Sequence, residues 1–160
     1  MADKKISRRD FLGLSLVIGG AIAITETLFV GLRFLSPKKA DGEFGGTFNL
    51  GAYDQFPLGS VTPVEKGRFY IVRLQDGGFL AVYRRCTHLG CSVPYDQATQ
   101  QFICPCHGSA FSMQGDVKNP PAVRPLDLFS LSITDTGDLL VNTESPIERD
   151  QFGPEQIIYG

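Results

Sequence analysis

Apolar residues follow one another almost without interruption from Phe11 to Leu32, in the run FLGLSLVIGGAIAITETLFVGL. At about 1.5 Å per residue, these 22 residues would form a helix of roughly 33 Å, long enough to cross the hydrocarbon core of a bilayer. The pattern therefore predicts a transmembrane helix over residues 11–35. No A-x-A cleavage site precedes the Ser36-Pro37 break, so we expect this helix to remain as an uncleaved anchor.

The rest of the chain has a different pattern, in which short apolar or alternating runs are separated by turn residues. Residues 75–78 (QDGG) and 135–138 (DTGD) are hairpin turn signals, and no segment has a helical period of useful length. These features predict an all-β domain of small antiparallel sheets. We expect residues 143–160 to be extended or irregular and to pack back on this domain or on a partner. The predicted strands lie at 47–51, 61–66, 68–74, 79–85, 100–104, 109–112, 126–133 and 138–142.

The two patterns divide the chain into four parts. Residues 1–10 are polar and basic, and residues 11–35 are the predicted anchor. Residues 36–46 (SPKKADGEFGG) contain a proline and three glycines with mixed charges, a composition that disfavours a fixed shape. We therefore expect a flexible hinge linker between the anchor and the β domain of residues 47–160.

Charge excludes one class of partner. Lys and Arg number 15 against 17 Asp and Glu, for a net charge of −2, and no nucleic-acid-binding pattern is present, so no nucleic acid is expected as a partner. The N-terminal end is basic, and Ser7–Leu12 (SRRDFL) looks like a twin-arginine (Tat) export motif, which carries folded proteins across a membrane. An ordinary positively charged flank would supply the same charges. Glu26, inside the apolar run, fits either a polar contact with a partner helix or a carboxylate tolerated near the interface.

All four cysteines and both histidines of the chain lie between residues 86 and 109. Each half of this stretch offers one Cys and one His as candidate ligands, plus one spare Cys. Zinc with Cys₂His₂ ligation is one interpretation, although zinc fingers usually place the two Cys together and the two His together. The mixed halves favour a two-iron cluster with two thiolates on one iron and two imidazoles on the other. The candidate ligands are Cys86 with His88 and Cys104 with His107, and the spare cysteines are Cys91 and Cys106.

At residues 86–91 (C-T-H-L-G-C) and 104–109 (C-P-C-H-G-S) the chain resembles the Rieske iron–sulfur proteins, in particular the Rieske subunit of quinol–cytochrome c reductases of the bc1 and b6f type. The resemblance implies an all-β Rieske fold with one [2Fe-2S] cluster per chain, held by an inserted cluster-binding subdomain at about 84–125. Cys86 and Cys104 would bind one iron and His88 and His107 the other, and a Cys91–Cys106 disulfide would join the two loops. A disulfide requires an oxidising compartment, so we expect the N-terminus in the bacterial cytoplasm and the domain on the outer face of the membrane.

The resemblance also assigns roles around the cluster. Ser109 would donate a hydrogen bond to a cluster sulfur, and His107 would face the quinol. Phe111 stands where many relatives have a tyrosine, which predicts a lower midpoint potential and favours menaquinol as the substrate. The remaining residues of the predicted cluster environment are Leu89 at the docking tip, Gly90 and Gly108, and Pro120 and Pro121 in the position of a proline-rich covering loop.

The resemblance predicts an electron-transfer subunit that takes an electron from quinol in a cytochrome b subunit and passes it to a c-type cytochrome. Release of the quinol proton on the outer side would couple the reaction to a membrane gradient. The chain lacks a quinol pocket of its own, so it would not be a complete enzyme. The alternative is the Rieske small subunit of a periplasmic molybdenum oxidase such as arsenite oxidase. Ferredoxin and oxygenase Rieske domains are disfavoured because they lack the extra cysteine pair.

Overall fold

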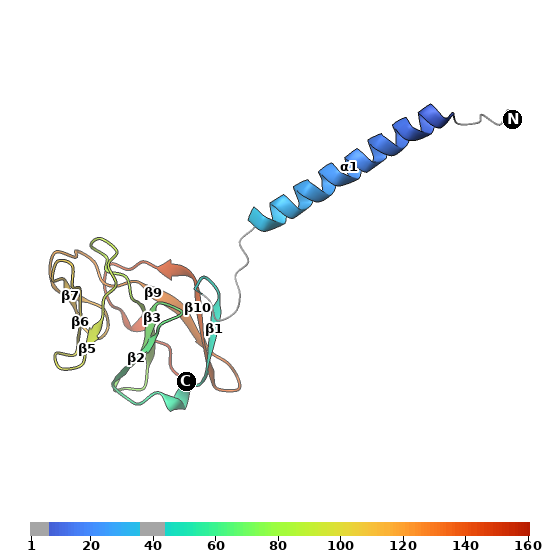
Figure 1. The fold of residues 1–160 in the computed structure, drawn as a ribbon. Helices are drawn as coiled ribbons and strands as arrows, with labels where there is room; N and C mark the ends of the chain where they lie inside the picture. The colour runs from blue at the N-terminus through green and yellow to red at the C-terminus, as the bar shows by residue number, and fades with distance from the viewer. Residues whose placement is uncertain (1–6, 36–43) are drawn as a thin grey trace. The chain divides into compact units, whose positions relative to one another are not determined.

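The computed structural model describes residues 7–35 and 44–160 and divides into two compact units, Met1–Lys38 and Lys39–Gly160 (Figure 1). The start of the basic N-terminus and most of the predicted hinge linker at 36–46 lie outside the described residues. The hinge therefore stays a prediction.

The described residues of the first unit form one helix, α1, which spans Arg8–Leu35 and has no buried residue. It begins three residues before the predicted start because Ser7 caps it. The Ser7 hydroxyl accepts a hydrogen bond from the Asp10 backbone N–H at 3.1 Å and donates one to the Asp10 carboxylate at 2.7 Å. The length and apolar composition of α1 are sufficient for the helix to cross a membrane. The export motif at Ser7–Leu12 stays a prediction.

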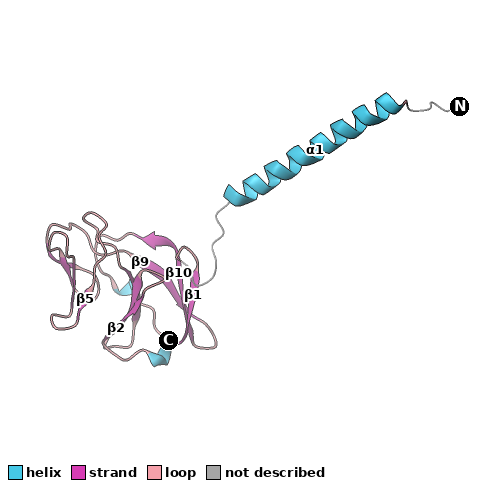
Figure 2. Cartoon of the chain, in the orientation of Figure 1, coloured by secondary structure: helices cyan, strands magenta, loops and turns pink. Residues whose placement is uncertain are grey.

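The second unit consists almost entirely of strands and loops (Figure 2). Its larger sheet has six antiparallel strands in the order β1-β10-β9-β4-β3-β2, and its smaller sheet has four in the order β5-β6-β7-β8. The all-β prediction is confirmed, and each of the eight predicted runs coincides with a strand. The strands are β1 (Thr47–Ala52), β2 (Ser60–Val64), β3 (Phe69–Arg73), β4 (Phe79–Tyr83), β5 (Tyr95–Asp96), β6 (Gln101–Ile103), β7 (Ala110–Phe111), β8 (Val117–Asn119), β9 (Leu128–Ile133) and β10 (Asp138–Ile147).

Four details of this unit were not predicted. The strands β5 and β8 were not among the predicted runs, and two 3₁₀ turns, η1 (Tyr53–Gln55) and η2 (Pro154–Gln156), fall in loops. The C-terminal tail packs back on the domain as predicted, because Ile158 exchanges backbone hydrogen bonds with Phe79 at 2.8 and 3.1 Å.

The central strands β3 and β4 are apolar on both faces because a separate core covers each face. Phe69 and Ile71 face a core with Phe79, Ala81, Phe129 and Leu139. The alternating residues Tyr70 and Val72 face the other core, together with Leu80 and Val82. That second core also contains Cys86, Cys104, Phe102 and Phe111, so the larger sheet supports the loops that carry the cysteines.

Candidate metal centre

The candidate metal site is built on two equivalent loops. The first loop, residues 86–91, follows β4, and the second loop, residues 104–109, connects β6 to β7. In each loop the backbone N–H of the first cysteine, Cys86 or Cys104, donates to the carbonyl five residues later at 2.8 Å. The carbonyl of the same cysteine accepts a hydrogen bond from the N–H of the glycine four residues later. This second bond is 2.8 Å long in the first loop and 3.0 Å in the second. These glycines, Gly90 and Gly108, have φ values of +80° and +76°, a conformation that costs other residues energy.

The equivalent loops bring together every candidate ligand that the sequence analysis named. The rings of His88 and His107 lie edge to face, with centroids 5.0 Å apart and planes at 86°. The thiols of Cys86 and Cys104 are free and buried, and the Cys104 thiol is near enough to raise the pKa of Cys86. The thiols therefore lie toward the protein interior, whereas His88 is half-buried and His107 is exposed.

The other two cysteines join the loops. Cys91 and Cys106 form a disulfide with a Cα–Cα distance of 6.7 Å, which confirms the predicted pairing. Their sulfur atoms and that of Cys104 all lie within 4.8 Å of one another, but the two disulfide sulfurs have no thiolate to offer a metal. The donor set consequently has two thiols and two imidazoles.

This donor set fits a cluster with two thiolates on one iron and two imidazoles on the other. Burial raises the pKa of the Cys86 thiol above its ordinary value, and the adjacent Cys104 thiol adds to the shift. A bound cation would reverse this preference, because metals bind the thiolate and not the thiol.

Three further segments surround the donor set. Ser109 is completely buried, and Phe111 lies behind the second loop with no exposed surface. The Asn119 side-chain amide donates to the carbonyl of Gly108 at 3.0 Å and to that of Pro120 at 3.1 Å, and the Pro120–Pro121 peptide is cis. The proline segment is thus tied to the second loop. Leu89 is 69% exposed at the tip of the first loop.

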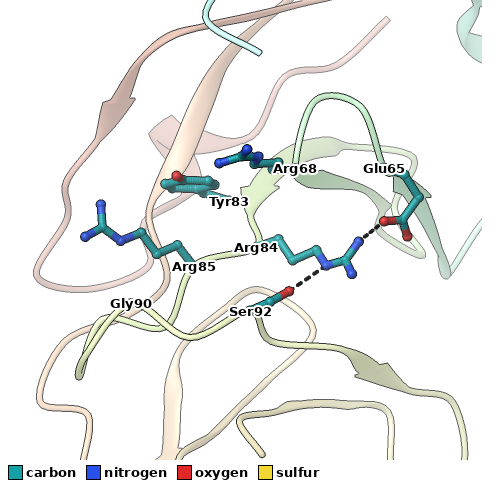
Figure 3. Close-up of a pocket in the computed structure, with 7 residues that line it drawn as sticks. All are labelled: Glu65, Arg68, Tyr83, Arg84, Arg85, Gly90 and Ser92. Atoms are coloured by element: carbon teal, nitrogen blue, oxygen red, sulfur yellow. Dashed lines mark hydrogen bonds and ion pairs between the residues drawn. The ribbon is translucent and has the colours of Figure 1, made fainter. Parts of the chain in front are cut away.

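Arginines precede the first loop. Arg84 donates a hydrogen bond to the Ser92 hydroxyl at 2.9 Å and pairs with the Glu65 carboxylate, whereas Arg85 extends toward Gly90 (Figure 3). The hydrogen bond to Glu65 raises the pKa of the Arg84 guanidinium above its ordinary value.

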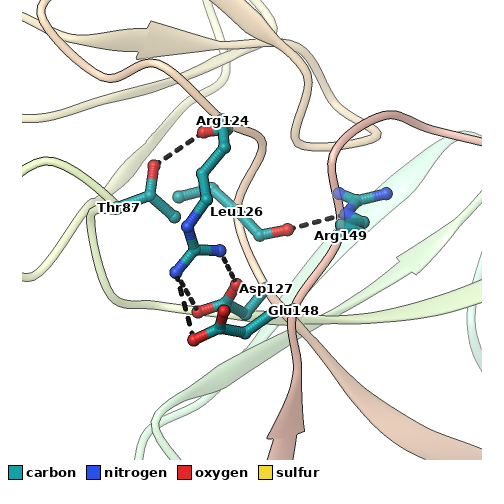
Figure 4. Close-up of polar contacts among 6 residues, drawn as sticks. All are labelled: Thr87, Arg124, Leu126, Asp127, Glu148 and Arg149. Carbon is teal, nitrogen blue, oxygen red and sulfur yellow. Dashed lines mark hydrogen bonds and ion pairs between the residues drawn. The ribbon is translucent and has the colours of Figure 1, made fainter.

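A polar network on another side of the first loop was not predicted from the sequence (Figure 4). The Thr87 hydroxyl donates to the Arg124 carbonyl at 2.7 Å, and the Arg124 guanidinium pairs with Asp127 and lies 3.6 Å from the Glu148 carboxylate. Buried Arg149 donates to the Leu126 carbonyl at 2.7 Å. No sequence signal links residues separated by 23 to 37 positions, so only the folded chain identifies these contacts.

Residues 48–131 match the family model of the Rieske [2Fe-2S] domain. The match covers more than half of the chain, so the protein belongs to the Rieske family and binds a [2Fe-2S] cluster. The cytochrome b6-f complex iron-sulfur subunit of Gloeobacter violaceus is 37% identical to it over 157 residues, covering 81% of this chain and 80% of that protein. The subunit of the same name from Prochlorococcus marinus (strain AS9601) is 32% identical over 151 residues, or 84% of each chain.

Solved structures show the same fold. A chain of a hyperthermophilic respiratory Complex III superposes with a TM-score of 0.55 and covers 79% of this chain and 98% of that chain. The identity between the two is 23%, so this likeness concerns the fold alone.

Proposed function

We propose that the protein is the Rieske electron-transfer subunit of a membrane quinol–cytochrome c oxidoreductase of the cytochrome bc type. The observation that carries the proposal is the convergence of two buried thiols and two adjacent imidazoles on disulfide-linked loops. The identities of 37% and 32% to cytochrome b6-f iron-sulfur subunits support the choice of complex. The apolar helix α1 supports single-pass anchoring in a membrane.

In this proposal Cys86 and Cys104 bind one iron and His88 and His107 bind the other. The buried position of the thiols and the outward position of the imidazoles agree with an inner iron and an outer iron. The cluster, when bound, supplies one-electron redox chemistry at a potential raised by its imidazole ligands. The Ser109 hydroxyl oxygen accepts a hydrogen bond from a backbone N–H, and its hydrogen remains free to donate. In this proposal Ser109 donates that hydrogen toward the cluster.

His107 performs the step that involves the substrate. Its imidazole is exposed, so its outer ring nitrogen can meet a quinol hydroxyl and take the proton that leaves with the electron. The exposed Leu89 provides apolar surface beside it for a cytochrome b subunit. The same exposure then allows the loops to approach a c-type cytochrome as the electron acceptor. Phe111 offers no hydroxyl to a ligand sulfur, which favours a low-potential quinol such as menaquinol.

The proposed location is the bacterial cytoplasmic membrane, with the N-terminus in the cytoplasm and the β domain outside. The Cys91–Cys106 disulfide supports an oxidising outer compartment for the domain. A twin-arginine signal at Ser7–Leu12 would export the domain after the cluster is inserted. The molybdenum oxidase alternative gains no support from the relatives described above, which are cytochrome b6-f subunits.

Purification of the full chain from membranes in a mild detergent tests the proposal. We expect haem-containing cytochrome subunits to copurify, and the reduced complex to show the low-temperature EPR signal of a Rieske cluster. His107→Ala should abolish that signal and quinol–cytochrome c reductase activity together. Copurification with a molybdopterin subunit and without haem would overturn the choice of complex, whereas one zinc per chain without iron would overturn the ligand assignment.

A further inference from the structure

A basic hollow of about 540 Å³ lies beside the first loop, and none of the candidate metal ligands lines it. It is lined by Glu65, Arg68, Tyr83, Arg84, Arg85, Gly90 and Ser92 (Figure 3). Three guanidinium groups face one carboxylate in this hollow, so two positive charges remain uncompensated by its lining.

The three arginines differ in what they contact. Arg84 is fully engaged, because it pairs with Glu65, donates to Ser92 and lies 5.7 Å from the Tyr70 ring. In the part of the chain that the structure describes, neither Arg68 nor Arg85 has a carboxylate or a carbonyl acceptor, and both are exposed. Within the described residues, no ion pair or hydrogen bond engages the side-chain donors of Arg68 or Arg85, although Arg85 also lines a second hollow with Asp127 and Glu148.

The backbone at Arg68 supports a role for its side chain. Arg68 has a φ of 55°, a left-handed conformation that glycine or asparagine adopts at lower cost, at the end of the turn that connects β2 to β3. Its guanidinium carbon lies 4.9 Å from the centroid of the Phe44 ring, a cation–π distance. A guanidinium in contact with a ring can still donate hydrogen bonds to an anion.

The neighbouring residues shape the hollow around these donors. Tyr83 is held by ring contacts with Phe44 at 5.9 Å and Phe129 at 4.8 Å, and it lies between the guanidinium groups of Arg68 and Arg85 in Figure 3. A Cβ at Gly90 would come within 3.1 Å of Arg85 Nε, so the absence of a side chain there leaves room for Arg85.

The geometry points to a binding site for a phosphate group, held by the forked donors of Arg68 and Arg85 with the Tyr83 hydroxyl between them. Guanidinium groups match phosphate oxygens in pairs, and two uncompensated positive charges suit a phosphate mono- or diester. The site is independent of the redox proposal, since none of its donors is a ligand candidate. Its phosphate can come from a free phosphorylated compound or from the headgroup of an anionic lipid.

Calorimetric titration of the full, cluster-containing chain in an uncharged maltoside detergent tests this site. The probes are inorganic phosphate and glycerophosphoglycerol, which carries a lipid-type phosphodiester without acyl chains, with chloride at equal ionic strength as the blank. We expect the native protein to bind at least one probe. Binding of phosphate alone identifies a free phosphate compound as the source, and binding of the diester identifies a lipid headgroup.

Matched variants separate the site from general charge attraction. Arg68→Gln and Arg85→Gln should each weaken binding about tenfold, as the loss of a charge-assisted hydrogen bond implies. The affinities of Arg68→Lys and Arg85→Lys for the probe should lie between those of the glutamine variants and that of the native protein. Lys118→Gln, which removes an exposed charge on β8, should bind the probe as tightly as the native protein does. Thermal unfolding establishes that each variant is folded.

Three results would overturn the proposal. The first is that neither probe binds the native protein. The second is that Lys118→Gln weakens binding as much as Arg68→Gln and Arg85→Gln do. The third is binding of an acidic peptide without binding of either phosphate probe, which would assign the hollow to the carboxylates of a protein partner.

Discussion

The Ser109 hydroxyl accepts a hydrogen bond from the backbone N–H of Ala122 at 3.0 Å, although the two residues are 13 positions apart. Ser109 closes the second loop, and Ala122 directly follows the Pro120–Pro121 segment, so one hydroxyl joins the loop to that segment. Both residues are buried, which strengthens the bond and makes its loss costly.

Replacement of this hydroxyl should change both redox chemistry and stability. Ser109→Ala removes the proposed hydrogen-bond donor to the cluster. If that bond is about 1 kcal/mol stronger in the reduced state than in the oxidised state, its loss lowers the midpoint potential of the variant by roughly 40 mV. The unpaired Ala122 N–H should also lower the free energy of unfolding by about 1–3 kcal/mol. Redox titration followed by EPR measures the first effect, and denaturant unfolding the second.

Ser112→Ala is the matched control for this variant, because the Ser112 hydroxyl likewise accepts a backbone N–H, that of Asp116 at 3.1 Å, in the turn between β7 and β8. It should lower stability and leave the midpoint unchanged. Equal midpoints for Ser109→Ala and the native protein would contradict the proposed donation to the cluster.

Phe111→Tyr should raise the midpoint potential. Phe111 is completely buried, shares a core cluster with Cys86 and Cys104, and lies opposite Phe102 in the β6–β7 pair. A tyrosine hydroxyl that bonds a ligand sulfur would stabilise the reduced form by about 1 kcal/mol, or roughly 40 mV. Protein-film voltammetry measures the shift.

Phe102→Tyr adds the same hydroxyl to an equally buried neighbouring ring and is the control for Phe111→Tyr. Its midpoint should stay near the native value. An unchanged midpoint in Phe111→Tyr would remove the argument for a low-potential quinol, since that argument depends on the missing hydroxyl.

Removal of the disulfide should destabilise the cluster loops. Cys91 and Cys106 are 15 positions apart, and a crosslink that closes a chain segment of this length contributes about 3 kcal/mol. The Cys91→Ala/Cys106→Ala protein should therefore unfold at lower urea concentration and lose its visible absorbance sooner. A mild thiol reductant should lower the urea concentration at which the native protein unfolds to that of the variant. If the reductant leaves this unfolding midpoint unchanged, the Cys91–Cys106 disulfide contributes little to stability.

Thr87→Val should loosen the first loop while its volume is kept. The variant removes the 2.7 Å bond from the Thr87 hydroxyl to the Arg124 carbonyl, which should cost about 1 kcal/mol and speed the loss of the cluster to an iron chelator. Thr99→Val removes an exposed bond of 2.8 Å to the Asp96 carboxylate and serves as the control. If both variants lose iron at the native rate, the Thr87 contact does not hold the loop.

Carboxylate protonation provides a further check on the smaller sheet. The Thr99 hydroxyl, followed by the Ala98 N–H, holds the pKa of Asp96 below its ordinary value of 3.8. Because the folded pKa lies below the unfolded one, the stabilisation is complete above pH 3.8 and is lost as the pH falls through the folded value. In Thr99→Val, NMR titration should give an Asp96 pKa closer to 3.8; an unchanged value would exclude the hydroxyl as the cause.

Several features of the protein followed from the sequence alone. The long apolar run from Phe11 predicted α1, and the alternating runs and hairpin turns predicted the antiparallel sheets, because both signals depend on residues close together in the chain. The paired motifs at 86–91 and 104–109 likewise predicted the family, since a cluster requires specific ligand types at short spacings.

Only the tertiary structure decided how these parts meet. It placed the thiols of Cys86 and Cys104 in a core and left His107 exposed, a division that depends on the sheet beneath the loops. It also joined Ser109 to Ala122 and left Arg68 and Arg85 around one hollow. Such contacts link residues far apart in the chain, so no local period or spacing encodes them; they form when burial of the two cores fixes the strand register.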